Sequence, residues 1–210
     1  FSDCYCLTNV VISGKIDCIE NYTFDGCWSL EQVSIPNTVT EIGDYAFNKC
    51  YSLTDISIPN SVVSIGEYAF NDCRSLNTLS MHDGITTIGD FAFYGCENLK
   101  SASIPDSVTS IGSCAFDDCA PDFYLIISRG SYAETYAIDN GIPYMCVIPN
   151  GTTAIEDKAF FECEMIGVSI PNSVTTIGRE AFRLCSNLKS VSIPNSVQSI
   201  EEGAFMNCTR

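Results

Sequence analysis

The sequence is poor in cationic side chains and contains a single histidine and a single tryptophan. Ten Lys and Arg residues stand against 26 Asp and Glu, so the formal net charge of the 210 residues is −16. A field of this sign repels phosphate backbones and anionic lipid headgroups. We therefore expect no nucleic acid partner, and a cationic partner fits the charge better.

Long apolar runs, a leader and catalytic motifs are missing as well. No stretch approaches the roughly 20 apolar residues that span a bilayer, so we expect no direct membrane insertion. The chain has neither an initial Met nor a signal peptide, which predicts that such parts were removed or that the chain is a piece of something longer. No phosphate loop, zinc-protease helix or G-x-S-x-G elbow is present. We therefore predict no enzyme, no catalytic residue, no metal site and no cofactor.

The one histidine does not change that prediction. A cysteine and His82 are conceivable as a nucleophile pair. However, His82 stands where most other repeats carry a turn proline, so an ordinary exposed turn residue is favoured.

What the sequence does contain is an internal repeat, whose period of roughly 23 residues is typical of a solenoid. Phenylalanine recurs at this period from Phe24 to Phe116, and cysteine does so from Cys4 to Cys119. The cysteine series continues with Cys163, Cys185 and Cys208. The shared skeleton is C-x-x-L-x-x-V-x-I-P-x-x-V-x-x-I-G-x-x-A-F.

Each repeat predicts one coil. The alternation around Ile56 and Ile58 predicts a short strand with one buried face, which Pro59 ends because proline cannot continue the ladder. Gly66 then allows a tight change of direction, and a single helical turn at residues 69–70 returns the chain. No coil buries its apolar residues alone, so the coils are expected to stack into a parallel sheet with one strand per coil.

Phrases such as residues 57–62 (SIPNSV) and 65–73 (IGEYAFNDC) carry a resemblance. The sequence resembles the BspA-like, or Treponema pallidum-type, leucine-rich repeats over essentially its whole length. The resemblance implies an α/β leucine-rich-repeat solenoid of about nine coils. Its parallel concave sheet has one strand per coil, and short helical turns, strands and loops form its convex side. Known members are mostly surface or secreted proteins associated with adhesion, which implies a cell-surface or secreted location here.

Residues 120–146 depart from the repeat. Residues 131–141 read as a helix, with Ser131 as N-cap, Glu134 as its capping-box partner and Gly141 as the stop. This predicts one irregular coil in which a longer helix forms the outer limb.

Two domain arrangements are compatible with this coil. The last strand position recurs with nearly constant steps from Ile12 to Ile193, which predicts a single solenoid over residues 1–210. The alternative is a boundary near residue 143, because similar helical segments often end arrays in the family. Both ends of the chain fall inside a repeat without a visible polar cap. We therefore also expect self-association through uncapped ends unless further coils follow.

Two interpretations are possible for the thirteen cysteines, and two for the acidic turns. Nine cysteines share one repeat position and should point in parallel into the core. Buried free thiols are favoured there, although distance alone would allow disulfides between coils. Acidic residues after the turn, at Asp44, Glu67, Asp90 and Asp157, are interpreted as a solvated edge, with a weak calcium site as the alternative.

Two surfaces are candidates for a partner. The small polar residues between the buried strand positions should face the concave side: Gln32, Ser34, Asp55, Ser57, Thr78, Ser80, Ser101, Ser103, Ser169, Ser190 and Ser192. The tyrosines of the irregular coil are the second: Tyr124, Tyr132, Tyr136 and Tyr144. We predict an adhesin-type module that binds an extracellular-matrix or cell-surface protein. The alternative is a structural spacer or self-assembling surface protein with no specific ligand.

Overall fold

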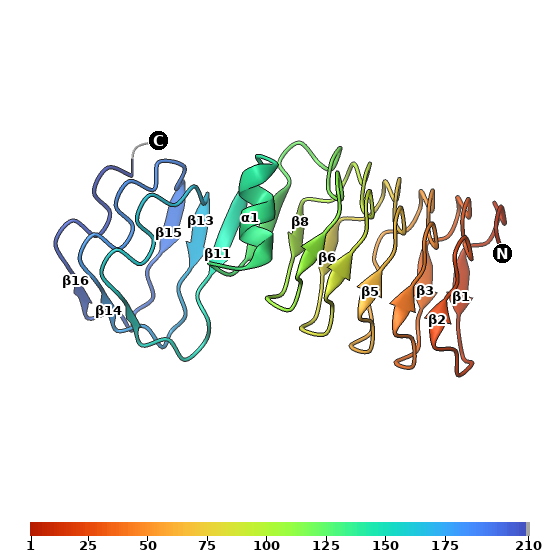
Figure 1. Ribbon diagram of the computed structural model, residues 1–210, viewed down its shortest axis with the longest axis horizontal. Coiled ribbons are helices and arrows are strands. Elements are labelled where there is room, and N and C mark those ends of the chain that lie inside the picture. Colours follow the sequence, from red (N-terminus) through yellow and green to blue (C-terminus); the bar gives the residue numbers. More distant parts are fainter. Residues whose placement is uncertain (209–210) are drawn as a thin grey trace. The chain divides into compact units, whose positions relative to one another are not determined.

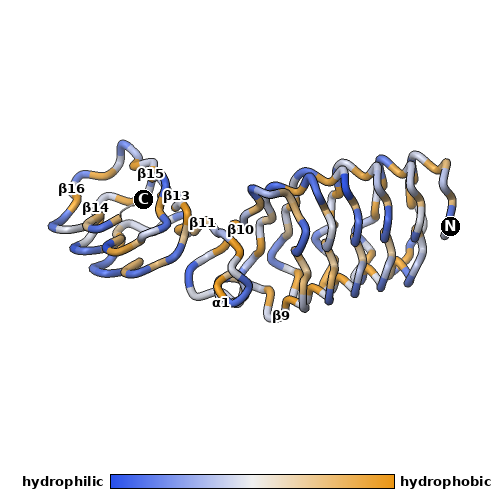
Figure 2. Tube along the Cα trace, turned by 90° about the horizontal axis from the view of Figure 1, so that it is seen from above, coloured by the Kyte–Doolittle hydropathy of each residue, from blue (hydrophilic) through white to orange (hydrophobic). Residues whose placement is uncertain are grey.

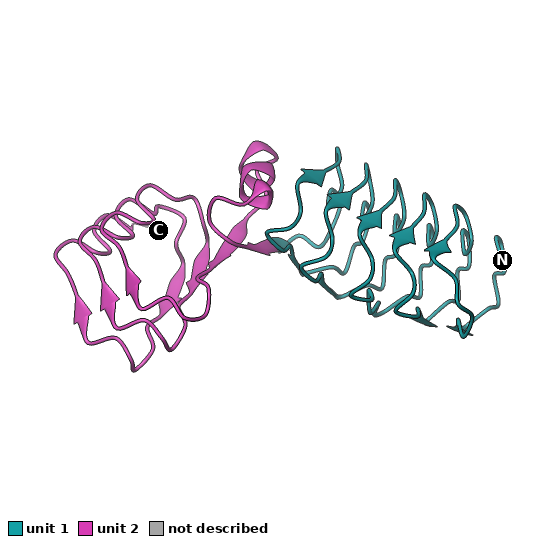
Figure 3. Ribbon diagram, turned by 60° about the horizontal axis from the view of Figure 1, so that its bottom comes forward, with its two compact units in different colours: residues 1–124 teal, residues 125–210 magenta. Residues whose placement is uncertain are grey.

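The structure, a computed structural model, describes residues 1–208. These form two compact units, unit 1 (residues 1–124) and unit 2 (residues 125 onward), shown in two colours in Figure 3. Each unit is a stack of coils, and most coils contain two short strands (Figure 1). Each strand pairs in parallel with a strand of a neighbouring coil, as β4 does with β5. The parallel repeat solenoid is confirmed, with a second strand on the far limb of most coils.

In unit 1 the two strand types form separate sheets. The first strands are β1 (Asn9–Val11), β3 (Gln32–Ser34), β6 (Thr78–Ser80) and β8 (Ser101–Ser103). The second strands are β2 (Cys18–Ile19), β4 (Glu41–Ile42), β5 (Ser64–Ile65), β7 (Thr87–Ile88) and β9 (Ser110–Ile111). The second strands pair in chain order into one five-stranded sheet. Among the first strands of this unit, β1 pairs with β3 and β6 pairs with β8.

The strand predicted around Ile56 and Ile58 is not formed, although both side chains are buried. The backbone of residues 55–58 makes no backbone hydrogen bond with any residue in the described range 1–208. The nearest bond to the next coil, from the Asn77 N–H to the Thr54 carbonyl, is 3.4 Å long. A ladder needs distances near 2.9 Å, so burial holds this stretch in its coil without completing the sheet.

Unit 2 contains the irregular coil. Its first strands are β10 (Tyr124–Ile127), whose first residue is the last residue of unit 1, β11 (Tyr144–Val147), β13 (Gly167–Ser169) and β15 (Ser190–Ser192). Its second strands are β12 (Ala154–Ile155), β14 (Thr176–Ile177) and β16 (Ser199–Ile200). Within this unit the first strands pair in parallel in chain order, and so do the second strands. Between β10 and β11, helix α1 (Tyr132–Asp139) takes the place of a second strand.

The predicted N-cap and stop of α1 are confirmed, but Glu134 accepts from the N–H of Gly130 instead of that of the N-cap Ser131. The Ser131 hydroxyl accepts a hydrogen bond from the Glu134 N–H at 3.2 Å, and the Glu134 carboxylate accepts one from the Gly130 N–H at 2.6 Å. Gly141 follows the C-cap with φ of 66°, in the left-handed region. The sheet of unit 2 runs directly from β10 to β11 to β13 across residue 143.

The core is built from columns, by which we mean residues at one position in successive coils. Phe24, Phe47, Phe70 and Phe93 are fully buried and stack with ring centroids 5.1–5.2 Å apart. Hydrophobic and hydrophilic stretches accordingly recur from coil to coil in unit 1 (Figure 2). Such a column gives each buried ring a near-parallel neighbour on both sides.

The recurring glycine of each repeat has a different role from the one predicted. Gly66 and Gly89 do not have positive φ. Instead, a Cβ on Gly89 would lie 2.6 Å from both the Glu67 nitrogen and the Gly66 carbonyl carbon of the preceding coil. The glycine is required by the close approach of two backbones rather than by a turn.

The helical turn predicted at residues 69–70 is also wrong. The segment forms consecutive tight turns with two left-handed residues per coil, such as Tyr68 (φ 54°) and Asp72 (φ 56°). In the first coils the second of these positions is occupied by Asp3, Gly26 and Lys49. An L-residue with a side chain pays a steric cost in this region.

Replacing Lys49 by glycine should therefore stabilise the protein. Lys49 is exposed and left-handed (φ 57°), so Lys49→Gly is expected to raise the free energy of unfolding by about 1 kcal/mol, as removal of a left-handed strain allows. Lys100→Gly is the matched control, because Lys100 is exposed but not left-handed. There the added freedom of glycine should lower stability by about 0.5–1 kcal/mol. Urea unfolding measures both; two changes of the same sign would contradict the argument.

Polar columns join the coils along their turns. The carboxylates of Asp44, Asp90 and Asp157 each accept a hydrogen bond from a backbone N–H of the next coil, at 2.7–2.8 Å. The Asn48 side chain, which is buried, donates to Asp25 and accepts from Asn71, both at 2.7 Å. The acidic turns are thus not merely a solvated edge, since these carboxylates bind the next coil.

Candidate interaction surfaces

The candidate face lies on the first strands, where side chains alternate between core and solvent. In β3 and β6 the central residues point inward while the flanking residues are exposed. The predicted residues that are exposed are Gln32, Ser34, Asp55, Ser57, Thr78, Ser80, Ser169, Ser190 and Ser192. Ser101 and Ser103 are half-buried. We call the exposed members of this set, taken within each unit, the first-strand face of that unit.

Pairing brings these residues into rows within each unit. Thr78 lies opposite Ser101, and Ser80 lies opposite Ser103. In unit 2, Ser169 lies opposite Ser192. The face therefore presents mainly small, uncharged hydroxyl groups, with Gln32 and Asp55 as the exceptions.

The sequence reasoning missed the first coil of this face. Val11 in β1 pairs with Ser34 and is 77% exposed, and Asn9 pairs with Gln32. The signal was available, because both residues precede their partners by one full repeat. An exposed valine beside Ser34 makes this end of the face less polar than the serine rows.

The interrupted strand at residues 55–57 borders a shallow hollow on the face of unit 1. Its volume is about 370 Å³, and it is lined by Asp55, Ser57, Thr78, Ser80 and His82, among others. The backbone polar groups of residues 55–58 lie in this region without backbone partners among residues 1–208. The hollow therefore offers both side-chain and main-chain hydrogen-bonding groups, which fits recognition of a polypeptide.

His82 is half-buried rather than an exposed turn residue. Its Nδ1 accepts a hydrogen bond from the Gly84 N–H at 3.0 Å, which places the proton of the neutral ring on Nε2. This hydrogen bond thus stabilises the turn at residues 82–84, where most other repeats have a proline.

The second predicted surface, the tyrosines of the irregular coil, is not a single exposed surface. Tyr136 and Tyr144 are buried, with 7% and 2% of their areas exposed. Tyr136 points inward because Ala133, Tyr136 and Ala137 form the buried stripe of α1. The Tyr144 hydroxyl donates to the Glu134 carboxylate at 3.3 Å, and burial raises the pKa of Tyr144. Tyr132 is exposed and Tyr124 is half-buried, so the four do not share one exposed patch.

A second column of aromatic residues, on the outer turns of unit 1, packs between successive coils. Tyr22, Tyr45, Tyr68 and Phe91 stack with ring centroids 4.7–4.8 Å apart and nearly parallel planes. Because each ring face contacts the next ring, this column presents mainly ring edges.

The cysteines are free thiols, as favoured from the sequence. In unit 1 the thiols of Cys50, Cys73 and Cys96 donate to phenylalanine carbonyls of the preceding coil, at 3.2–3.4 Å. Burial raises the pKa of each of these thiols, and that of Cys119 to about 12. The thiolate is the nucleophilic form, so burial keeps these four thiols in the less reactive protonated form at neutral pH.

Residues 1–208 offer neither a clustered metal-ligand set nor a membrane-spanning helix. No group of three or more His, Cys, Asp or Glu side chains in that range is arranged to hold a metal ion. Among the same residues, α1 is the single helix, and it is too short to span a bilayer.

Comparison with known proteins identifies the repeat. Six copies of the BspA type leucine rich repeat region match residues 1–121 and 139–210. No curated protein matches the chain. Among solved structures, a Treponema pallidum leucine-rich repeat protein is 27% identical, with a TM-score of 0.55, over 87% of this chain and 78% of that one.

Two other solved structures match the chain with lower TM-scores. The pneumococcal vaccine antigen PcpA is 21% identical with a TM-score of 0.54, over 90% of this chain, which spans 51% of PcpA. A leucine-rich cell surface protein of Faecalibacterium prausnitzii is 28% identical with a TM-score of 0.39, over 90% of this chain and 60% of that one. PcpA supports the fold alone. On the repeats that span nearly its whole length, this chain belongs to the BspA-type leucine-rich repeat family.

Proposed function

We propose that this chain is the protein-binding part of a cell-surface or secreted protein of adhesin type. The observation that carries the proposal is the first-strand face of unit 1, an open row of exposed polar residues. It lies beside the backbone of residues 55–58, which has no backbone hydrogen-bond partner among residues 1–208. Family membership supports it, because proteins with these repeats are generally interaction or surface proteins. The buried, protonated thiols of unit 1 are consistent with a module that binds rather than reacts.

The partner proposed is an extracellular-matrix or cell-surface protein that lays an extended segment across the face. Small side chains let a partner backbone approach closely, and the hollow beside Ser57 and Ser80 receives one of its side chains. The acidic charge of the chain favours a segment of positive charge. We also propose that residues 1–210 form one solenoid and act as a single binding module.

Paired lysines on the face test the proposal. Ser57→Lys with Ser80→Lys is expected to weaken binding to immobilised matrix proteins or cells at least about tenfold, because like charges facing each other across an interface are costly. Thr87→Lys with Ser110→Lys is the control: it adds the same charge to two paired, exposed positions of the second strands. Biolayer interferometry gives both affinities.

Equal losses in the two variants would show a general charge effect, and no loss in either would exclude the first-strand face. Absence of binding to all matrix proteins and cells tested, by the unaltered chain, would contradict the adhesin proposal. It would leave a spacer role, for which concentration-dependent assembly in light scattering is the measurement.

A further inference from the structure

An aromatic row in unit 1 is not explained by the fold or by the first-strand face. Tyr5, Trp28, Tyr51 and Arg74 follow one another at the period of the repeat. The ring centroids lie 4.4 Å apart between Tyr5 and Trp28 and 6.0 Å apart between Trp28 and Tyr51. The guanidinium carbon of Arg74 lies 5.0 Å from the Tyr51 centroid. We call these four residues the Trp28 row.

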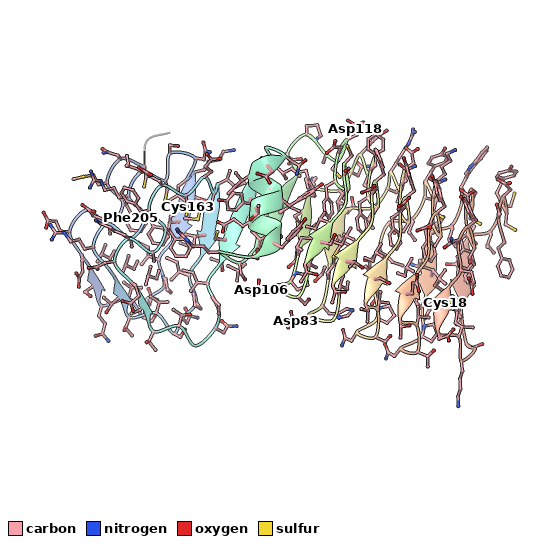
Figure 4. All side chains as sticks on the ribbon, viewed as in Figure 1. Cys18, Asp83, Asp106, Asp118, Cys163 and Phe205 are labelled. Carbon is pink, nitrogen blue, oxygen red and sulfur yellow. The ribbon has the colours of Figure 1, made fainter. Side chains whose placement is uncertain are left out.

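The row belongs to the turn that precedes the first strand. Trp28 lies between the cysteine column and β3, just after Gly26 in the chain. Asp118 has the position of Gly26 in its own coil, and Figure 4 shows it at one edge of unit 1. Asp83 and Asp106, which follow the first strands, lie at the opposite edge. The Trp28 row therefore lies on a different edge from the turns that end the first strands.

Trp28 is exposed in spite of its neighbours. The Tyr5 and Tyr51 rings on its two sides are tilted by 41° and 38° to the indole, so neither lies flat against it, and 47% of the residue remains accessible. The phenylalanine column, by contrast, is fully buried at Phe47 and Phe70. An indole held between two tilted rings but left open to solvent is a pre-organised contact, and Trp, Tyr and Arg are the residues most enriched at interaction hot spots.

The charges of the row leave a place for a cation. Arg74 is already paired, at 3.1 Å from Asp72 and 3.5 Å from Glu97. Unit 1 holds 17 Asp and Glu against 4 Lys and Arg, a formal net charge of −13. Within residues 1–208 the cations that stack on rings lie over Tyr51, Phe160 and Phe161 and not over Trp28. The indole is nevertheless the best aromatic acceptor for a cation.

We propose that the Trp28 row is a docking site for an arginine-bearing segment of a partner protein. The partner's guanidinium stacks on the Trp28 indole in the way that Arg74 stacks on Tyr51, and the negative charge of unit 1 attracts the segment. Arginine is favoured over lysine because its planar, weakly hydrated group stacks on aromatic faces. This site is separate from the first-strand face and does not require it.

A short peptide tests the site, because Trp28 is the single tryptophan of the chain and its fluorescence reports on this site alone. The probe is an otherwise uncharged Gly-Ser peptide carrying two arginines. Its control carries citrulline, which has nearly the same shape without the charge. The arginine peptide is expected to change Trp28 fluorescence to saturation and to protect Trp28 from acrylamide quenching. The citrulline peptide should do neither.

Variants separate stacking from general attraction. Trp28→Ala should weaken binding of the arginine peptide about fivefold in calorimetry, the loss of one exposed cation–π contact. Tyr132→Ala removes an aromatic of similar exposure from unit 2 and should leave the affinity unchanged. The ratio between wild type and Trp28→Ala should persist at about 0.5 M NaCl, where long-range attraction is screened.

Equal affinities of wild type and Trp28→Ala would overturn the proposal, as would a wild-type Trp28 that the saturating peptide leaves open to acrylamide. The second result needs no variant, so it holds even if Trp28→Ala folds poorly. The Ser57→Lys and Ser80→Lys pair should bind the peptide as wild type does. Loss of matrix binding with retention of the peptide therefore distinguishes the two surfaces.

Discussion

Phe70→Ala is expected to lower the free energy of unfolding by about 3–5 kcal/mol, the range for truncating a buried phenylalanine. Phe70 is fully buried, and its ring stacks at 5.1 Å on Phe47 and 5.2 Å on Phe93. The substitution leaves a cavity between two coils, and neither coil can move into it without breaking its own ladder. Urea unfolding followed by circular dichroism measures the loss.

Phe1→Ala is the control for the same column. Phe1 stacks on Phe24 at 5.6 Å but is 74% exposed. Its truncation removes little buried area, so the cost should stay below about 1 kcal/mol. Similar losses for Phe1→Ala and Phe70→Ala would mean that the column does not stabilise the fold through burial.

Gly89→Ala is expected to cost about 3 kcal/mol, the upper end of the range for overpacked sites. The new Cβ would lie 2.6 Å from the Glu67 nitrogen and 2.8 Å from the Gly66 carbonyl oxygen. Both atoms are backbone, so no side chain can rotate away. The coils must separate, and the hydrogen bond from the Gly89 N–H to the Ile65 carbonyl, 2.8 Å long, is strained with them.

Gly14→Ala tests whether the effect is specific to the glycine column. The nearest atom to a Cβ on Gly14 is a side-chain carbon of Ile16 at 3.9 Å. That substitution should be neutral, or stabilising by about 0.5 kcal/mol through the unfolded chain. If Gly89→Ala unfolds at the same urea concentration as Gly14→Ala, coil spacing does not explain the repeated glycine.

The Trp28 row shows why a site can be missed in a repeat. Its members Tyr5, Trp28, Tyr51 and Arg74 share the spacing of the repeat but not a single residue type. A search for the shared skeleton passes over them, because the skeleton records the residues that every coil needs. A function confined to a few coils depends on residues at the positions that vary between coils. The ring and guanidinium distances show that these four residues form one row.

The sequence by itself determined the period, the parallel solenoid, the buried phenylalanine and cysteine columns and the caps of α1. These follow from spacing and from bonds within a few residues, such as Ser131 to Glu134. Only the tertiary structure decided that residues 55–57 form no strand and that Tyr136 and Tyr144 are buried. It also decided that Gly89 serves close packing. Each depends on the distance to a neighbouring coil or limb, which the packing of many side chains sets together and no local pattern encodes.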